Sequence, residues 1–233
     1  MYYNYNNAII GWDCVKKITI ITGHYGSGKT NISANLGIKL AQAGEKVTVV
    51  DLDIVNPYFR TADFSGLFEK NGVTLISPMY ANTNLDIPAI SFDIERLAIE
   101  PGYLIIDVGG DDTGATALGR YHEPFMRFKD DIDMLYVINC YRYMTRSSDE
   151  ALELFYDIEK TARFSHTGII NNSNLGELTT EQTVLDSLGF ASEVCKGAKL
   201  PLIFTAAPKN IKSDKLDKVA EYVDIYVKPL WAE

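Results

Sequence analysis

The chain has 233 residues, of which 46% are hydrophobic, and a formal net charge of −9. This length suits one α/β domain, and we expect residues 1–233 to form a single nucleotide-binding domain. The acidic net charge would repel nucleic-acid phosphates, so DNA binding is not expected. The sequence contains no run of 18 apolar residues, so no membrane span is predicted.

The first fourteen residues, MYYNYNNAIIGWDC, are aromatic and rich in asparagine. They lack the basic start and the long apolar core of a secretory signal peptide, so we expect a cytoplasmic protein. We interpret this segment as an N-terminal extension or an added edge strand.

A buried strand is predicted over residues 18–22, because they are apolar and mostly β-branched. Residues 23–30 then read GHYGSGKT and match G-x-x-x-x-G-K-[ST], the P-loop or Walker A pattern. A helix with one apolar face is predicted over residues 31–43. This strand–loop–helix context is the one in which the pattern binds nucleotides.

The residue types of this loop suit a bound triphosphate. Glycines let the backbone turn tightly and bring its N–H groups close to phosphate oxygens, and the next helix offers the positive end of its dipole. We expect Lys29 to reach the β- and γ-phosphates and the hydroxyl of Thr30 to bind Mg²⁺. The predicted nucleotide-binding residues of the loop are Gly23, His24, Tyr25, Gly26, Ser27, Gly28, Lys29 and Thr30.

Strands and helices alternate along the rest of the chain. Strands are predicted over residues 46–50, 73–77, 103–107, 133–139, 167–171 and 200–205, and helices over 92–99, 115–128, 147–163, 179–193 and 214–227. This alternation favours a three-layer α/β P-loop NTPase fold, with a mainly parallel central sheet and helices on both faces. Ligands of such sheets bind at the carboxyl ends of the strands.

Carboxylates follow two of the predicted strands. Asp107 ends the apolar run YLIID, an arrangement typical of a Walker B aspartate, and we predict that it holds Mg²⁺ through water. Asp51 and Asp53, two residues apart, would point the same way if their strand continued. We predict that Asp51 contacts the metal shell and that Asp53 orients the attacking water. The alternative for each aspartate is a cap on the following loop.

Together, the P-loop, the D-L-D segment and the D-V-G-G segment that starts at Asp107 resemble the MinD/ParA/Mrp group of ATPases, within the SIMIBI class and the CobQ/CobB/MinD/ParA nucleotide-binding domains. The resemblance covers nearly the whole chain. It implies binding of ATP, ADP and Mg²⁺ and hydrolysis of ATP, with residues 51–60 and 107–114 as switch loops. It also implies that Asn171, of the Asn171-Asn172 pair that ends a predicted strand, reads the base and that Pro208 packs against it. The alternative for Asn171 is an Asx-turn in the loop. The guanine-specific N-K-x-D pattern is missing, so ATP is expected rather than GTP.

One position departs from that group. Many of its members carry a lysine after the first P-loop glycine, and this lysine reaches the nucleotide of a partner subunit. Here the position is His24, followed by Tyr25, so the trans-acting lysine is absent and a homodimer is left open. His24 either donates a hydrogen bond to phosphate or lies on the loop surface. Arg60 and Arg120 are candidates for the missing charge.

Three functions are compatible with these residues. The first is a slow Mg²⁺-dependent ATPase that acts as a switch for a protein partner. The second is a biosynthetic enzyme that phosphorylates a small carboxylate, as dethiobiotin synthetase and cobyrinic acid synthase do. The third is a module that binds ATP without hydrolysing it. The D-L-D segment favours the first, and the absent lysine gives weight to the third.

Overall fold

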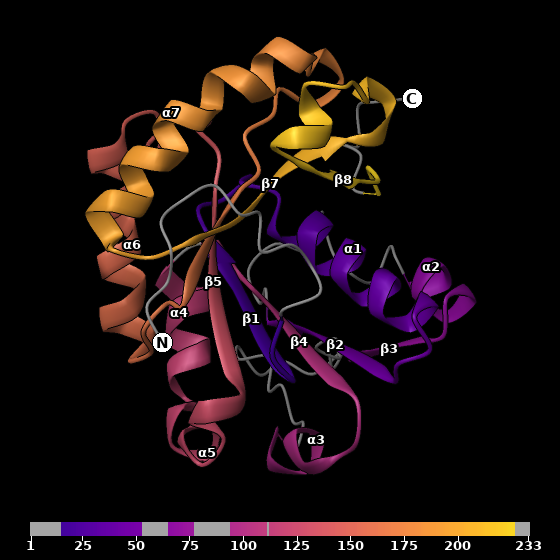
Figure 1. Cartoon of the computed structure of the whole chain (residues 1–233). Helices are drawn as coiled ribbons and strands as arrows, with labels where there is room; N and C mark the ends of the chain where they lie inside the picture. Colours follow the sequence, from indigo (N-terminus) through magenta and orange to yellow (C-terminus); the bar gives the residue numbers. More distant parts are fainter. Residues whose placement is uncertain (1–14, 53–64, 77–93, 111, 227–233) are drawn as a thin grey trace, which may run out of the picture.

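The computed structural model describes residues 15–52, 65–76, 94–110 and 112–226 (Figure 1). Within them, parallel strands form one sheet in the order β3-β2-β4-β1-β5-β6-β7-β8. The strands are β1 Ile18–Gly23, β2 Val47–Leu52, β3 Val73–Ile76, β4 Tyr103–Val108, β5 Ile132–Ile138, β6 Gly168–Asn171, β7 Leu202–Pro208 and β8 Glu221–Val223. The predicted central parallel sheet is confirmed.

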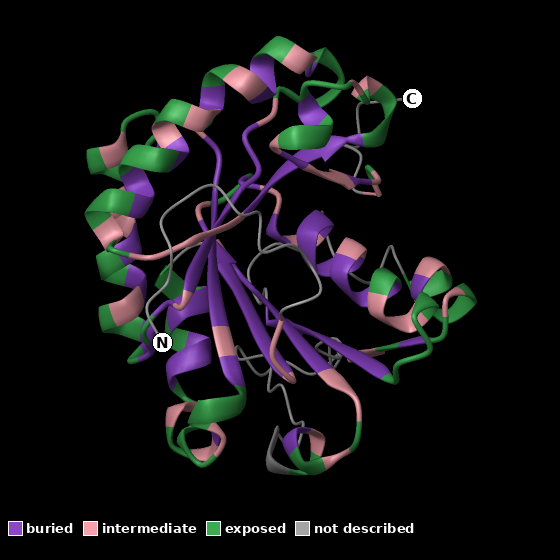
Figure 2. Ribbon diagram, in the orientation of Figure 1, coloured by how far each residue is buried: buried purple, intermediate pink, exposed green. Residues whose placement is uncertain are grey.

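Helices cover both faces of this sheet. They are α1 Lys29–Gln42, α2 Ser65–Lys70, α3 Ile94–Ile99, α4 Asp112–Gly119, α5 His122–Met126, α6 Ser148–Ala162 and α7 Glu181–Ala198. In Figure 1, α1 and α2 lie on one side of the sheet, and α4, α6 and α7 lie on the other. The strands are buried, whereas the outer surfaces of the helices are exposed (Figure 2). This is the predicted three-layer arrangement.

Alternation along the strands builds two cores. Ile20 and Ile106 face the cluster that contains residues of α4, α6 and α7. Their neighbours in the sequence, Ile21 and Ile105, point to the other face, toward the cluster that contains residues of α1. Because both faces are buried, the central strands are apolar throughout rather than alternating with polar residues. No helix within the described part of the chain is long and apolar enough to cross a membrane.

The prediction of a C-terminal helix over residues 214–227 is wrong for residues 214–226, which the structure describes. A short 3-10 turn, Leu216–Lys218, leads into β8, which pairs in parallel with the end of β7. Val223 of β8 is buried in the core beside α1. Pairing with an available sheet edge therefore overrides a weak helical pattern.

The helix predicted over residues 115–128 is divided into α4 and α5. The break follows Gly119, whose Cα lies so close to the backbone of α6 that a Cβ there would be 2.9 Å from the carbonyl oxygen of Thr161. Pro124 lies inside α5 and has no N–H for a hydrogen bond to the preceding turn. A continuous helix is therefore interrupted between Gly119 and Pro124.

Candidate nucleotide-binding site

The strand order brings the predicted site together at the carboxyl edge of the sheet. β1, which carries the P-loop, lies between β4 and β5. Asp107 of β4 is in register with Ile21 of β1 and with Asp51 of β2. Asp51 and Asp107 are each 1% exposed. Asp107 thus lies on the strand next to the one that leads into the P-loop, and Asp51 lies on the strand beyond it.

Two glycines of the P-loop occupy places where no side chain fits. A Cβ on Gly23 would lie 2.3 Å from the carbonyl oxygen of Val137, and a Cβ on Gly28 would lie 2.1 Å from Nδ2 of Asn172. Gly28 also caps α1 in the left-handed conformation, with φ 92°. Gly23 is therefore required by its close approach to the backbone of β5, and Gly28 by its left-handed conformation and by the Asn172 side chain packed on it.

Lys29 lies under the loop rather than in solvent. It is 7% exposed, and its Nζ donates a hydrogen bond to the carbonyl oxygen of His24 at 3.1 Å. Gly110, in the predicted second switch loop, approaches the same place. A Cβ on Gly110 would lie 2.8 Å from Nζ of Lys29 and 2.6 Å from the backbone nitrogen of Tyr25. The structure therefore packs the two loops directly against each other.

His24 is a weak substitute for a lysine in this structure. Burial, followed by the positive charge of Lys29, holds the pKa of His24 below its ordinary value, although a hydrogen bond with the backbone of Tyr143 acts in the opposite direction. The neutral imidazole is therefore favoured near neutral pH. The next residue, Tyr25, is 55% exposed at the tip of the loop.

Asn172, which the sequence analysis did not single out, contacts the P-loop. Its Nδ2 donates to the carbonyl oxygen of Ser27 at 2.7 Å. Its neighbour Asn171 points into the fold, where Nδ2 donates to Oγ of Ser187 at 2.9 Å and Oδ1 accepts from the backbone nitrogen of Ser173 at 3.2 Å. Base reading by Asn171 stays a prediction, and it would require these contacts to open.

Arg142 is a second P-loop contact that the sequence analysis did not single out. Its Nε donates to the carbonyl oxygen of Gly26 at 2.9 Å. Arg120, considered above for the missing charge, follows the far end of α4, where Gly119 packs on the last turn of α6. Among the residues that the structure describes, Arg142 rather than Arg120 therefore lies beside the P-loop. Asp53 and Arg60 lie outside the described residues.

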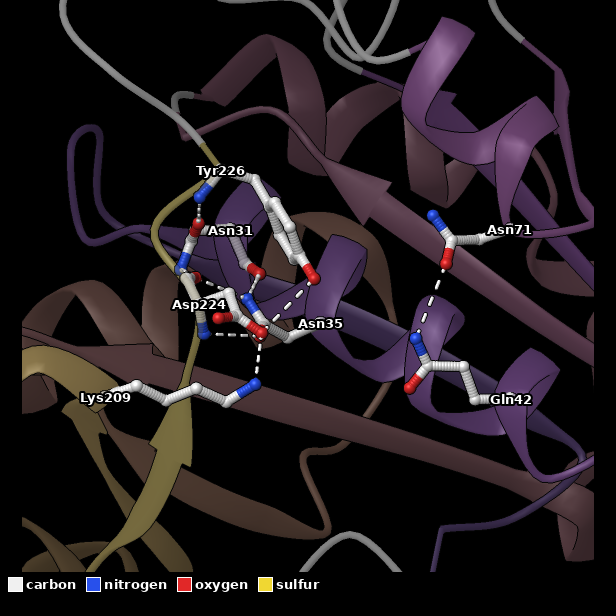
Figure 3. Close-up of polar contacts among 7 residues, drawn as sticks. All are labelled: Asn31, Asn35, Gln42, Asn71, Lys209, Asp224 and Tyr226. Atoms are coloured by element: carbon white, nitrogen blue, oxygen red, sulfur yellow. Dashed lines mark hydrogen bonds and ion pairs between the residues drawn. The ribbon is translucent and has the colours of Figure 1, made fainter. Parts of the chain in front are cut away.

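The helix that follows the P-loop also holds the C-terminal segment (Figure 3). Asn31 donates to the carbonyl oxygen of Asp224 at 3.0 Å and accepts from the backbone nitrogen of Tyr226 at 2.9 Å. Asn35 pairs with both backbone groups of Asp224, at 2.9 and 2.8 Å. The Asp224 carboxylate pairs with Lys209, which follows the buried Pro208 at the end of β7. The predicted base-contacting edge is thus linked to the first turns of α1.

The residues present fit a nucleotide with Mg²⁺. Asp51, Asp107 and the Thr30 hydroxyl offer the hard oxygen ligands that Mg²⁺ prefers, and such sites need only one or two carboxylates together with phosphates and water. Lys29 and the N-terminus of α1 provide the positive side of the site. An all-parallel sheet with this loop and these buried carboxylates defines a P-loop nucleotide-binding domain.

A family model for the CobQ/CobB/MinD/ParA nucleotide binding domain matches residues 18–184, so the chain belongs to this family of MinD/ParA-like P-loop proteins. A relative named "Putative arsenical pump-driving ATPase 1", from Aquifex aeolicus (strain VF5), is 41% identical over 83 residues. That match covers 34% of this chain and 20% of the relative, so the similarity spans about a fifth of that protein.

Solved structures share the fold. The cell division protein FtsY of Thermotoga maritima has a TM-score of 0.56 and 21% identity, over 88% of this chain and 66% of its own. Chloroplast FtsY of Physcomitrella patens has a TM-score of 0.59 and 15% identity, over 94% and 65%. A nucleotide-binding protein of Archaeoglobus fulgidus, solved with ADP, has a TM-score of 0.53 and 20% identity, over 92% and 90%. This chain thus spans just under two thirds of the FtsY chains.

Proposed function

We propose that this protein is a Mg²⁺-dependent ATPase that hydrolyses ATP slowly and acts as a nucleotide switch for a protein partner. The contact of Gly110 with Tyr25 and Lys29 carries this proposal. A loop packed on the place where the terminal phosphate binds has to move when that phosphate arrives or leaves. Such movement is what a partner protein would detect.

The proposed roles follow from the positions of the residues. Lys29, the loop N–H groups and the N-terminus of α1 would bind and orient the phosphates. Thr30, Asp51 and Asp107 would hold Mg²⁺, which neutralises phosphate charge when bound. Asp53 would orient the attacking water. Asn171 and Pro208 would contact the adenine base.

One observation favours a second candidate, a module that binds ATP without hydrolysing it. The lowered pKa of His24 favours a neutral side chain at the position where the group that the sequence resembles often carries a lysine. A biosynthetic enzyme that transfers phosphate to a small carboxylate differs from both candidates, because it needs a carboxylic acid as a second substrate.

We expect slow phosphate release from ATP and Mg²⁺ by the wild type and its loss in Asp53→Ala. The matched control is Asp130→Ala. It removes an exposed carboxylate just before the amino end of β5, whereas the site lies at the carboxyl ends of the strands. The molar mass with and without ATP, measured by light scattering, tests homodimer formation. ATP binding without turnover would support the second candidate, and turnover only with an added carboxylic acid would indicate a biosynthetic enzyme.

A further inference from the structure

The loop between β5 and α6, residues 139–147, touches the P-loop at two points. Arg142 donates from Nε to the carbonyl oxygen of Gly26, and the backbone of Tyr143 forms a hydrogen bond with His24. A Cβ on Gly26 would lie 3.5 Å from Nε and 3.8 Å from Cζ of Arg142. The guanidinium therefore packs over the tip of the phosphate-binding loop.

The carbonyl group that Arg142 binds belongs to a tight turn over residues 24–27. The backbone nitrogen of Ser27 donates to the carbonyl oxygen of His24 at 3.1 Å, and Gly26 has φ 73° at the third position, as a type II turn requires. The peptide that joins Gly26 to Ser27 is thus held at both ends, by Arg142 at its carbonyl and by His24 at its N–H. A planar peptide held at both ends cannot rotate.

The backbone of Arg142 is itself held in place. The carbonyl oxygen of Asn139 accepts from the backbone nitrogen of Arg142 at 3.2 Å and from Oγ1 of Thr145 at 3.0 Å. The Oδ1 of Asn139 accepts from the backbone nitrogen of Tyr141 at 3.0 Å, and the Tyr141 hydroxyl donates to the carbonyl oxygen of Thr183 in α7 at 2.8 Å. The loop that carries the arginine is therefore fastened to the body of the protein.

We propose that Arg142 is a positioning residue of the nucleotide site. It fixes the Gly26–Ser27 peptide, and with it the turn at the tip of the phosphate-binding loop, and it places a permanent positive charge beside a loop whose second residue is histidine rather than lysine. The ligand class is a nucleoside di- or triphosphate, so this inference rests on the proposed function.

Calorimetric titration of ATP and of ADP with Mg²⁺ tests this role. We expect Arg142→Ala to raise the Kd for both nucleotides about tenfold, because one charge-assisted hydrogen bond to the loop is lost. Arg142→Lys keeps the charge and a donor and restores most of the affinity. Arg146→Ala is the control: it removes the same charge from the same loop, and the Arg146 side chain lies over the Tyr143 ring, 5.9 Å from its centroid.

A spectroscopic readout separates positioning from a general effect on stability. A hydrogen bond to the Gly26 carbonyl polarises the peptide that contains the Ser27 nitrogen. In nucleotide-free protein labelled with ¹⁵N, we expect the Ser27 amide signal to move in Arg142→Ala and to stay in place in Arg146→Ala.

Unchanged ATP affinity in Arg142→Ala, or an equal loss in Arg146→Ala, would overturn the inference. An unmoved Ser27 amide in Arg142→Ala would also overturn it. A wild type that binds neither nucleotide would instead refute the proposed function, which the same titration shows before any variant is compared.

Discussion

At the residue scale, His166 is a buried titratable group beside the P-loop strand. Its Nε2 lies 2.8 Å from Oγ1 of Thr22, the residue just before the first P-loop glycine, and its Nδ1 lies 3.3 Å from the Glu159 carboxylate. Its ring centroid is 4.4 Å from that of Phe155. Burial lowers the pKa of His166 below 6.5, and the pairing with Glu159 only partly opposes this effect.

This shift predicts a loss of stability in mild acid. The unfolded chain, with an ordinary histidine pKa near 6.5, binds a proton more readily than the folded protein, so the contribution of His166 is present above that pH and falls below it. We expect the free energy of unfolding in urea to drop more between pH 7.5 and 5.5 in the wild type than in His166→Gln. An equal drop in wild type and His166→Gln would contradict this assignment.

The sequence predicted some site residues better than others. Lys29 and Asp107 belong to contiguous patterns whose chemistry is local, so they are visible without a structure. Asn172 and Arg142 contact backbone carbonyls of residues 145 and 116 positions away in the chain. Such contacts leave no spacing pattern, because a carbonyl is present at every residue and the pairing is set by strand order.

At the element scale, α1 connects the P-loop to the C-terminal segment through Asn31 and Asn35 (Figure 3). Two amides one turn apart bind the backbone of residues 224–226 much as a neighbouring strand would. This arrangement satisfies backbone groups that follow β8. It also ties the end of the described chain to the helix whose N-terminus faces the phosphate site.

We expect Asn35→Ala to lower the free energy of unfolding by about 1–3 kcal/mol, because it leaves the backbone N–H of Asp224 without its side-chain acceptor and removes one of the two amide donors to the Asp224 carbonyl oxygen. Gln42→Ala is the matched control on the same helix. The hydrogen bond from Gln42 to Asn71 is exposed and 3.4 Å long (Figure 3), so its loss should change the free energy of unfolding by no more than about 0.5 kcal/mol. Denaturant unfolding of both variants measures the difference, and equal losses would show that the Asn35 contacts contribute nothing specific.

Helix starts were better predicted than the last helix. The helices predicted from residues 147 and 179 begin at Ser148 and Glu181, where Ser147 and Thr180 form capping boxes. These signals are local. Residues 214–226 carry a helical spacing, but residues 221–223 pair with β7 instead, which depends on an unpaired strand of the sheet that lies elsewhere in the chain.

At the scale of the whole molecule, alternating strands and helices were enough to predict a parallel sheet with helices on both faces. The order of the strands was not predictable in this way, because alternation is compatible with many orders. It is this order, with β4 between β2 and β1, that brings Asp51 and Asp107 into register beside the P-loop.

Calorimetric titration of ATP in the presence of Mg²⁺ shows directly whether the carboxyl ends of these strands bind ATP with Mg²⁺. We expect one site per chain in the wild type. In Lys29→Ala the Kd should rise on the order of a hundredfold, because a charged contact to phosphate is lost. Lys39→Ala, at an exposed lysine in the last turn of α1, should bind as the wild type does. No binding by the wild type, or equal binding by Lys29→Ala, would contradict the account.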